Sequence, residues 1–184
     1  MRTSDVDILI IPGWSGSSPQ HWQMRWATKL STARVVEQPD WYKPDPVIWA
    51  DNIVAAVAAA TRPVVLMAHS AGNAAVAHAG ARLNDGRVIG GFLVAPASER
   101  ALLAIPGMTP GFATFPSERL PFRSVLASST TDPYCTVDEA TALADAWGAE
   151  FSDAGDAGHI NVASGHGPWP EGLMRLAGFM RSLG

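Results

Sequence analysis

The chain is poor in cysteine and in long apolar runs. Its 184 residues include one cysteine, Cys135, so neither an internal disulfide nor a cysteine-built zinc site can form. The longest apolar stretches, such as 53–60 and 64–68, are far shorter than the roughly 20 residues that a membrane-spanning helix needs. The sequence therefore predicts neither a disulfide scaffold nor a membrane partner.

Clusters of basic residues are also missing. No segment gathers five or more Lys and Arg, and the net charge is −4, which argues against nucleic acid as a partner. Residues 1–7 contain no apolar signal core. Together with the single cysteine, this predicts a cytoplasmic protein whose partner is a small molecule.

The composition that remains is that of an ordinary folded protein. Hydrophobic residues make up 47% and charged residues 16% of the chain, values that exclude a disordered protein, and seven Trp imply a large buried aromatic area. The length suits one domain spanning residues 1–184.

Short apolar runs alternate with helical patterns along the chain. Six strands are predicted, at 6–11, 34–38, 64–68, 88–95, 122–128 and 150–153. Five helices are predicted, at 19–30, 47–60, 71–83, 137–147 and 170–183. This alternation predicts an α/β fold with a mostly parallel sheet and helices on both faces. Residues 98–121 carry four prolines without clean periodicity, and we interpret them as a short cap segment.

The most informative segment is 64–78, in which an apolar strand meets Ser70 and an alanine-rich helix follows at once. No room is left for an ordinary loop, so Ser70 is expected on a sharp elbow with its hydroxyl exposed. Ala68 and Gly72 stand two positions to either side, as in the G-x-S-x-G pattern with alanine for the first glycine. Such an elbow presents a nucleophile; the alternative is a serine that only caps a helix.

A serine hydroxyl becomes nucleophilic when a histidine accepts its proton and a carboxylate orients that histidine. In hydrolases built on this kind of sheet, the three residues occur in the order Ser, acid, His. Asp132 follows the fifth predicted strand in a polar loop beside Pro133, and His159 follows the sixth in a glycine-rich loop. We therefore predict a triad of Ser70, Asp132 and His159, against the alternative that Asp132 only caps a turn.

Three other histidines are weaker candidates for the base. His166 is the main competitor, but it leads into the closing helix, whereas His159 lies closer to the end of a strand. His69 is expected to point away from Ser70 because neighbouring residues alternate at the elbow, and His78 lies inside a helix.

Acyl transfer also needs hydrogen-bond donors for the oxyanion that develops. The backbone amides of Trp14 and Ala71 occupy the expected positions, after the first strand and after the nucleophile. Trp14 and Trp41 are predicted to border an apolar substrate pocket suited to an acyl chain or an aromatic ester. No phosphate-binding loop and no metal-ligand spacing is present, so we predict no cofactor and no metal.

Several motifs together resemble a known family. They are Pro-Gly-Trp-Ser-Gly-Ser-Ser-Pro-Gln-His-Trp-Gln at 12–23, Ala-His-Ser-Ala-Gly at 68–72, Asp-Pro-Tyr at 132–134, Gly-His at 158–159 and Gly-Pro-Trp-Pro-Glu-Gly at 167–172. The chain resembles the small serine hydrolases that include retinoblastoma-binding protein 9 and the bacterial YdeN proteins, most specifically in its His-Trp-Gln motif at 21–23. The resemblance implies a compact α/β-hydrolase fold and a triad at Ser70, Asp132 and His159.

These observations predict a serine hydrolase that cleaves a small carboxylic ester, thioester or amide through an acyl-enzyme intermediate. Two alternatives remain. One is another enzyme on the same triad, such as a perhydrolase or a lyase, and the other is a non-catalytic binding protein on the same fold, with residues 98–121 as its contact surface. The name of the human relative suggests an L-x-C-x-E motif, but the residues around Cys135 do not match it.

Overall fold

The computed structural model describes all residues, 1–184, and contains one six-stranded sheet. The strands are β1 (Asp7–Ile11), β2 (Ala33–Val35), β3 (Val64–Ser70), β4 (Val88–Pro96), β5 (Arg123–Ser128) and β6 (Glu150–Asp153). Their order is β2-β1-β3-β4-β5-β6, and every neighbouring pair is parallel. The predicted α/β-hydrolase fold is confirmed, with a wholly parallel sheet in place of a mostly parallel one.

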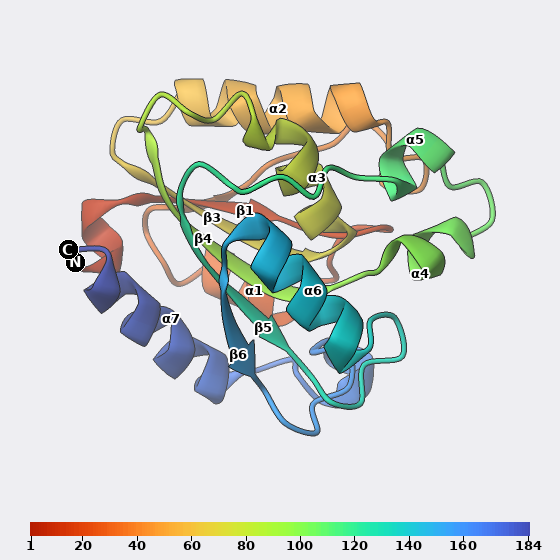
Figure 1. The fold of residues 1–184 in the computed structure, drawn as a ribbon. Helices are drawn as coiled ribbons and strands as arrows, with labels where there is room; N and C mark the ends of the chain where they lie inside the picture. Colours follow the sequence, from red (N-terminus) through yellow and green to blue (C-terminus); the bar gives the residue numbers. More distant parts are fainter.

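Helices cover both faces of this sheet (Figure 1). One face carries α1 (Trp22–Ala27) and α7 (Pro170–Ser182), and the other carries α2 (Pro46–Ala58), α3 (Ala71–Gly80) and α6 (Val137–Trp147). Two 3-10 turns, η1 (Thr3–Asp5) and η2 (Val162–Ser164), complete the regular structure outside the segment 98–121. The chain ends lie side by side at the amino-terminal edge of the sheet, so the opposite edge is left to the loops that follow the strands (Figure 1).

Burial on both faces explains why the central strands are continuous apolar runs rather than alternating ones. All five residues of β1 are buried, and so are the first six of β3. Successive residues of β3 enter different cores: Leu66 packs on the α2–α3 side and Met67 on the α1–α7 side. The sheet is therefore held from both sides, and the positions of its strand ends are fixed.

Helix α1 begins later than the sequence predicted. Instead of starting at Pro19 it starts at Trp22, with His21 as the cap: the Nδ1 atom of His21 accepts a hydrogen bond from the backbone N–H of Gln23 at 3.2 Å. The fully buried side chain of Gln23 donates to the carbonyl oxygens of Ile11 and Met67, each at 3.3 Å. These bonds attach the first turn of α1 to strands β1 and β3. Residues 12–20, between β1 and α1, form a loop.

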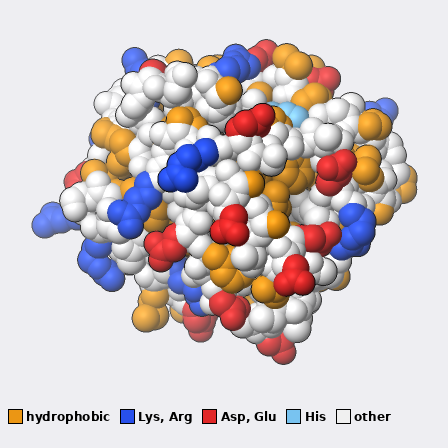
Figure 2. Space-filling model, viewed as in Figure 1, with side chains coloured by type: hydrophobic (Ala, Val, Ile, Leu, Met, Phe, Trp, Pro, Cys, Tyr) orange, Lys and Arg blue, Asp and Glu red, His pale blue; other side chains and the backbone are white.

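The segment 98–121 contains two short helices, α4 (Glu99–Leu103) and α5 (Pro110–Ala113). Leu102 and Phe112 are fully buried, so the segment packs firmly on the α2–α3 core. On its outer side, the surface between this segment and α6 is hollowed, and Leu103, Phe115 and Leu143 line the hollow (Figure 2). No helix of the structure has both the length and the apolar character needed to cross a membrane.

Candidate active site

Ser70 is the last residue of β3, and α3 begins at the next residue. Its backbone has φ 55° and ψ −128°, a strained conformation for a residue with a side chain. The hydroxyl makes no capping hydrogen bond to α3, so Ser70 does not serve as a helix cap. The side-chain N–H₂ of Asn73 donates to the carbonyl oxygens of Ser70 (3.0 Å) and Val94 (2.9 Å), which holds the elbow against β4.

Two glycines allow the elbow to lie close to the loop after β1. A Cβ atom on Gly72 would collide with the carbonyl oxygen of Ile11, and one on Gly13 would lie 2.8 Å from the Cβ of Ser70. Both positions therefore require glycine because the backbones approach too closely for a side chain. Ala68, which replaces the first glycine of the sequence pattern, is fully buried within β3 and is accommodated there.

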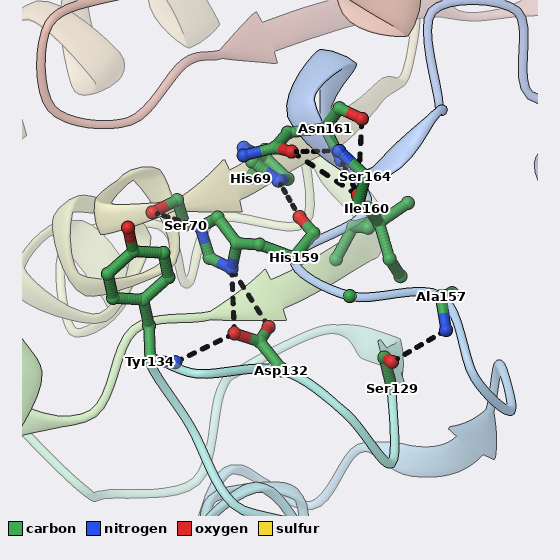
Figure 3. Close-up of polar contacts among 12 residues, drawn as sticks. His69, Ser70, Ser129, Asp132, Tyr134, Ala157, His159, Ile160, Asn161 and Ser164 are labelled. Atoms are coloured by element: carbon green, nitrogen blue, oxygen red, sulfur yellow. Dashed lines mark hydrogen bonds and ion pairs between the residues drawn. The ribbon is translucent and has the colours of Figure 1, made fainter.

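The three predicted triad residues are brought together above the carboxyl edge of the sheet (Figure 3). His159 Nε2 lies 2.9 Å from Ser70 Oγ, and His159 Nδ1 lies 2.8 Å and 3.0 Å from the two carboxylate oxygens of Asp132. The side chain of Asp132 is wholly buried and that of His159 is 8% exposed. Since Nδ1–H donates to the carboxylate, Nε2 is free to accept the Ser70 proton, as nucleophilic catalysis by serine requires.

The loops that carry Asp132 and His159 are joined by a buried serine. Ser129 Oγ accepts a hydrogen bond from the backbone N–H of Ala157 at 2.9 Å (Figure 3). It donates to the carbonyl oxygen of Gly155 at 2.9 Å. Neither loop has regular structure at these residues, and the contacts of Ser129 tie the loop of Asp132 directly to the loop of His159.

A cavity of about 300 Å³ opens in front of Ser70. One wall is apolar and comes from the end of β4 and the segment after it, through Ala97, Ala101, Leu102 and Ile105. The other wall is polar and includes Ser15, His21, Tyr134 and Asn161. No Lys, Arg, Asp or Glu lines the cavity, so it presents no fixed charge to a ligand.

A protein-family model described as serine hydrolase matches residues 8–178. The chain belongs to this serine hydrolase family. The match covers most of the chain and confirms the resemblance that the motifs indicated. Among curated protein sequences, no significant match was found.

Solved structures agree with this membership. A YdeN-like protein from Pectobacterium atrosepticum is 31% identical, with a TM-score of 0.85 over 98% of this chain and 94% of that one. The ydeN gene product of Bacillus subtilis is 18% identical, with a TM-score of 0.76 over 96% and 99% of the two chains. An esterase from Rhodococcus is 15% identical, with a TM-score of 0.72 over 100% and 93%, and shares the fold.

The two amides predicted to bind the oxyanion belong to adjoining segments of the chain. Ala71 is the first residue of α3, so its N–H has no acceptor within the helix. A Cβ atom on Gly13 would lie 3.2 Å from the Ala71 nitrogen, which shows how closely the loop that continues into Trp14 approaches that amide.

The two tryptophans predicted to border the substrate differ in position. Trp14 lines the cavity, and its Nε1–H donates to the carbonyl oxygen of Tyr42 at 3.0 Å. Trp41 does not line the cavity; its ring packs edge-on against Trp49, with centroids 5.5 Å apart. The carbonyl oxygen of Trp41 accepts from the N–H of Ser15 at 2.8 Å, so Trp41 supports the loop that carries Trp14.

His69 is closer to the site than the sequence predicted. His69 is among the residues that line the same cavity as Ser70, and its Nε2–H donates to the carbonyl oxygen of His159 at 2.9 Å. As expected for neighbouring residues of a strand, the ring of His69 points away from the Ser70 hydroxyl. The loop that carries His159 lies on the side to which this ring points, and the ring binds it there. His21, Tyr134 and Asn161 also line the cavity and were missed, because no local pattern relates them to Ser70.

The competing histidine lies elsewhere. His166 contacts Ser164 Oγ through Nδ1 at 3.3 Å and lies edge-on to Trp169, with ring centroids 6.4 Å apart. His78 donates from Nε2 to the carbonyl oxygen of Phe112 at 3.0 Å and ties α3 to α5. Neither histidine is hydrogen-bonded to Ser70.

Two histidines beside the site are held neutral. Burial, and secondarily the nearby His159, lowers the pKa of His21 to about 4. Burial also lowers the pKa of His69 well below its usual value, with smaller effects from His159 and His21. The three rings lie in sequence, His21 to His69 at 4.7 Å and His69 to His159 at 4.9 Å between centroids. The imidazole rings of His21 and His69 therefore stay uncharged near neutral pH.

These lowered pKa values predict that mild acid destabilises the fold. Between pH 6.5 and 4 the unfolded chain binds a proton at His21 that the folded chain does not, so the free energy of unfolding decreases as the pH falls. From His21 alone, the loss approaches about 3 kcal/mol by pH 4. Urea unfolding at a series of pH values measures it. His21→Asn keeps a capping side chain without a titrating ring, so the free energy of unfolding should depend less steeply on pH in this variant than in the wild type. An equally steep dependence on pH would contradict the prediction.

Proposed function

We propose that the protein cleaves a small carboxylic ester, thioester or amide through an acyl-enzyme intermediate on Ser70. The observation that carries this proposal is the unbroken hydrogen-bonded chain from Ser70 Oγ through His159 to a wholly buried Asp132 carboxylate, at the mouth of an uncharged cavity. Membership of the serine hydrolase family supports it, and among the similar folds are proteins described as esterases.

In the proposed reaction, Ser70 Oγ attacks the carbonyl carbon of the substrate while His159 Nε2 takes up its proton. Asp132 accepts the Nδ1–H bond and stabilises the imidazolium that forms. The imidazolium then protonates the leaving group, and the acyl group stays on Ser70. Water repeats the sequence and releases the acid, with His159 again acting first as base and then as acid.

The oxyanion of each tetrahedral intermediate is assigned to the backbone N–H groups of Trp14 and Ala71. Both lie beside the elbow, and preorganised donors of this kind supply a large part of the stabilisation in acyl transfer. Because the donors are main-chain groups, substitution of the Trp14 side chain should affect substrate fit more than charge stabilisation.

The cavity favours an uncharged substrate with a short apolar group. Its apolar wall offers contact area to a small acyl or alcohol group, and no Lys or Arg lines the cavity to pair with a carboxylate or phosphate. Desolvating such a charge without a partner would be costly. The segment 98–121 provides part of this wall and is assigned the role of a short cap within a single domain.

Labelling with a fluorophosphonate probe tests the function directly. Intact-protein mass spectrometry should show one adduct on the wild type and none on Ser70→Ala, whereas Ser15→Ala, which removes another hydroxyl lining the cavity, should retain it. Among p-nitrophenyl esters, butyrate should be cleaved faster than an ester whose acyl chain ends in a carboxylate. A folded wild type without adduct would refute the proposal and favour partner binding at residues 98–121.

A further inference from the structure

The His-Trp-Gln motif at 21–23 takes no part in the proposed chemistry, yet its side chains reach the segments that do. The side chain of Gln23 donates to Ile11 at the carboxyl end of β1 and to Met67 in the middle of β3. Trp22 is fully buried, and its Nε1–H donates to the carbonyl oxygen of Ile160 at 2.9 Å, a contact across 138 residues of sequence. The motif thus extends from the first helix to the loop that carries the candidate base.

A second ring N–H binds the neighbouring carbonyl group. His69 Nε2–H donates to the carbonyl oxygen of His159 at 2.9 Å (Figure 3). Two consecutive carbonyl groups are therefore each bound by a buried ring. His69 from β3 binds the carbonyl of His159, and Trp22 from α1 binds the carbonyl of Ile160. We call this pair of bonds the carbonyl clamp.

The backbone at this point needs such support. His159 lies between Gly158, with φ 55°, and Ile160, with φ 46°. A β-branched residue at positive φ is a clear outlier and persists only where the surroundings impose it. Ile160 is fully buried in the α1–α7 core, and the loop after β6 contains no regular structure before η2. The clamp supplies directional bonds where no helix or strand does.

His69 is suited to this task because it remains neutral. A neutral imidazole carries one N–H, and the bond to the His159 carbonyl assigns that proton to Nε2. A charged ring here would lie 4.9 Å from the ring that becomes imidazolium during the reaction and would oppose its formation.

We propose that Trp22 and His69 are positioning residues for the reaction, holding the His159 imidazole where it meets Ser70 and Asp132 at once. This role rests on the proposed function. The ring must keep 2.9 Å to Ser70 Oγ and 2.8 Å to Asp132 Oδ2 together, and proton transfer is sensitive to displacements well below 1 Å. Loss of either bond would free one of the two carbonyl groups beside His159, and the imidazole of His159 would then be less firmly oriented.

Matched tryptophan variants test the first bond. Trp22→Phe keeps an aromatic ring but removes the N–H, and Trp26→Phe makes the same change in a buried ring 4.7 Å away that has no bond to the loop. We expect Trp22→Phe to lower kcat, and the rate of fluorophosphonate labelling, at least about ten-fold with KM nearly unchanged. Trp26→Phe should alter either value by no more than about two-fold.

A second pair of variants isolates the N–H of His69. His69→Gln retains a donor on a side chain of similar reach, whereas His69→Leu removes it; Gln should recover most of the labelling rate that Leu loses. Hydrogen exchange of the backbone amides in residues 154–165 should be faster in Trp22→Phe and His69→Leu than in their controls, independently of activity.

The outcomes separate this role from the function on which it rests. Wild-type labelling at Ser70 with equal losses in Trp22→Phe and Trp26→Phe, or with Gln no better than Leu at position 69, would overturn the clamp and leave the proposed function intact. Faster exchange in the loop without slower labelling would likewise overturn it. A wild type that is not labelled would refute the proposed function itself.

Discussion

Replacing His159 with alanine is expected to lower kcat/KM for ester hydrolysis by a factor on the order of 10⁴. Ser70 would lose the imidazole whose Nε2 lies 2.9 Å from its Oγ, and no other side chain is hydrogen-bonded to that oxygen. The serine would then attack as a neutral hydroxyl, and the leaving group would receive no proton from the protein. The activity that remains would come from binding and from the backbone amides alone.

His166→Ala is the matched control for this result. It removes a second histidine of the same loop region, one that contacts Ser164 and Trp169 rather than Ser70. We expect it to keep kcat/KM within about three-fold of the wild type. Steady-state hydrolysis of p-nitrophenyl butyrate measures both variants, and circular dichroism confirms that they are folded. A large loss in His166→Ala with activity retained in His159→Ala would reverse the assignment of the base.

Much of this arrangement follows from local sequence patterns. The apolar runs predicted six strands because each strand is either buried on both faces or bounded by turn residues. The elbow at Ser70 was predictable because a strand pattern and a helix pattern meet there without a loop. The meeting of Asp132 with His159 follows from topology, since parallel strands place their carboxyl ends, and the loops after them, at one edge of the sheet.

The supporting contacts could not be predicted in this way. The surroundings of His69 depend on the position of a loop 90 residues further along the chain. The periodicity of the sequence around His69 carries no information about that loop. The start of α1 depends on the hydrogen bonds from the Gln23 side chain to β1 and β3. These tertiary contacts outweigh the helix-initiating signal of Ser18-Pro19. Trp41 could not be distinguished from Trp14 for the same reason: both follow strands, and only packing decides which ring meets the cavity.

The same contacts explain how loops without regular structure can hold Asp132 and His159 at fixed positions. Ser129 joins the loop of Asp132 to the loop of His159, and the buried rings of His69 and Trp22 bind the two consecutive carbonyl groups of His159 and Ile160. Tyr134 adds a further constraint: its backbone N–H donates to Asp132 Oδ1 at 2.9 Å, which fixes the orientation of the carboxylate. The carboxylate is thus committed to one hydrogen-bond pattern before any substrate arrives.

This commitment makes Asp132→Asn a severe change despite its small size. The asparagine oxygen is expected to stay on the Tyr134 N–H, so the amide nitrogen takes the place of Oδ2, 2.8 Å from His159 Nδ1. An amide N–H₂ donates, so it favours the imidazole tautomer with a bare Nδ1 and a proton on Nε2. That proton points at Ser70 Oγ, and the ring can no longer accept from the serine.

We therefore expect Asp132→Asn to lower kcat at neutral pH by a factor on the order of 10³ to 10⁴ while the protein remains folded, since the substitution preserves shape and removes a buried charge. Asp138→Asn, the same change at an exposed position in the first turn of α6, should leave kcat nearly unaltered. Burst-phase measurements with a p-nitrophenyl ester would locate the loss in acylation. A variant that acylates at the wild-type rate would mean that the tautomer of His159 is set by something other than Asp132, and the assigned role of that carboxylate would fall.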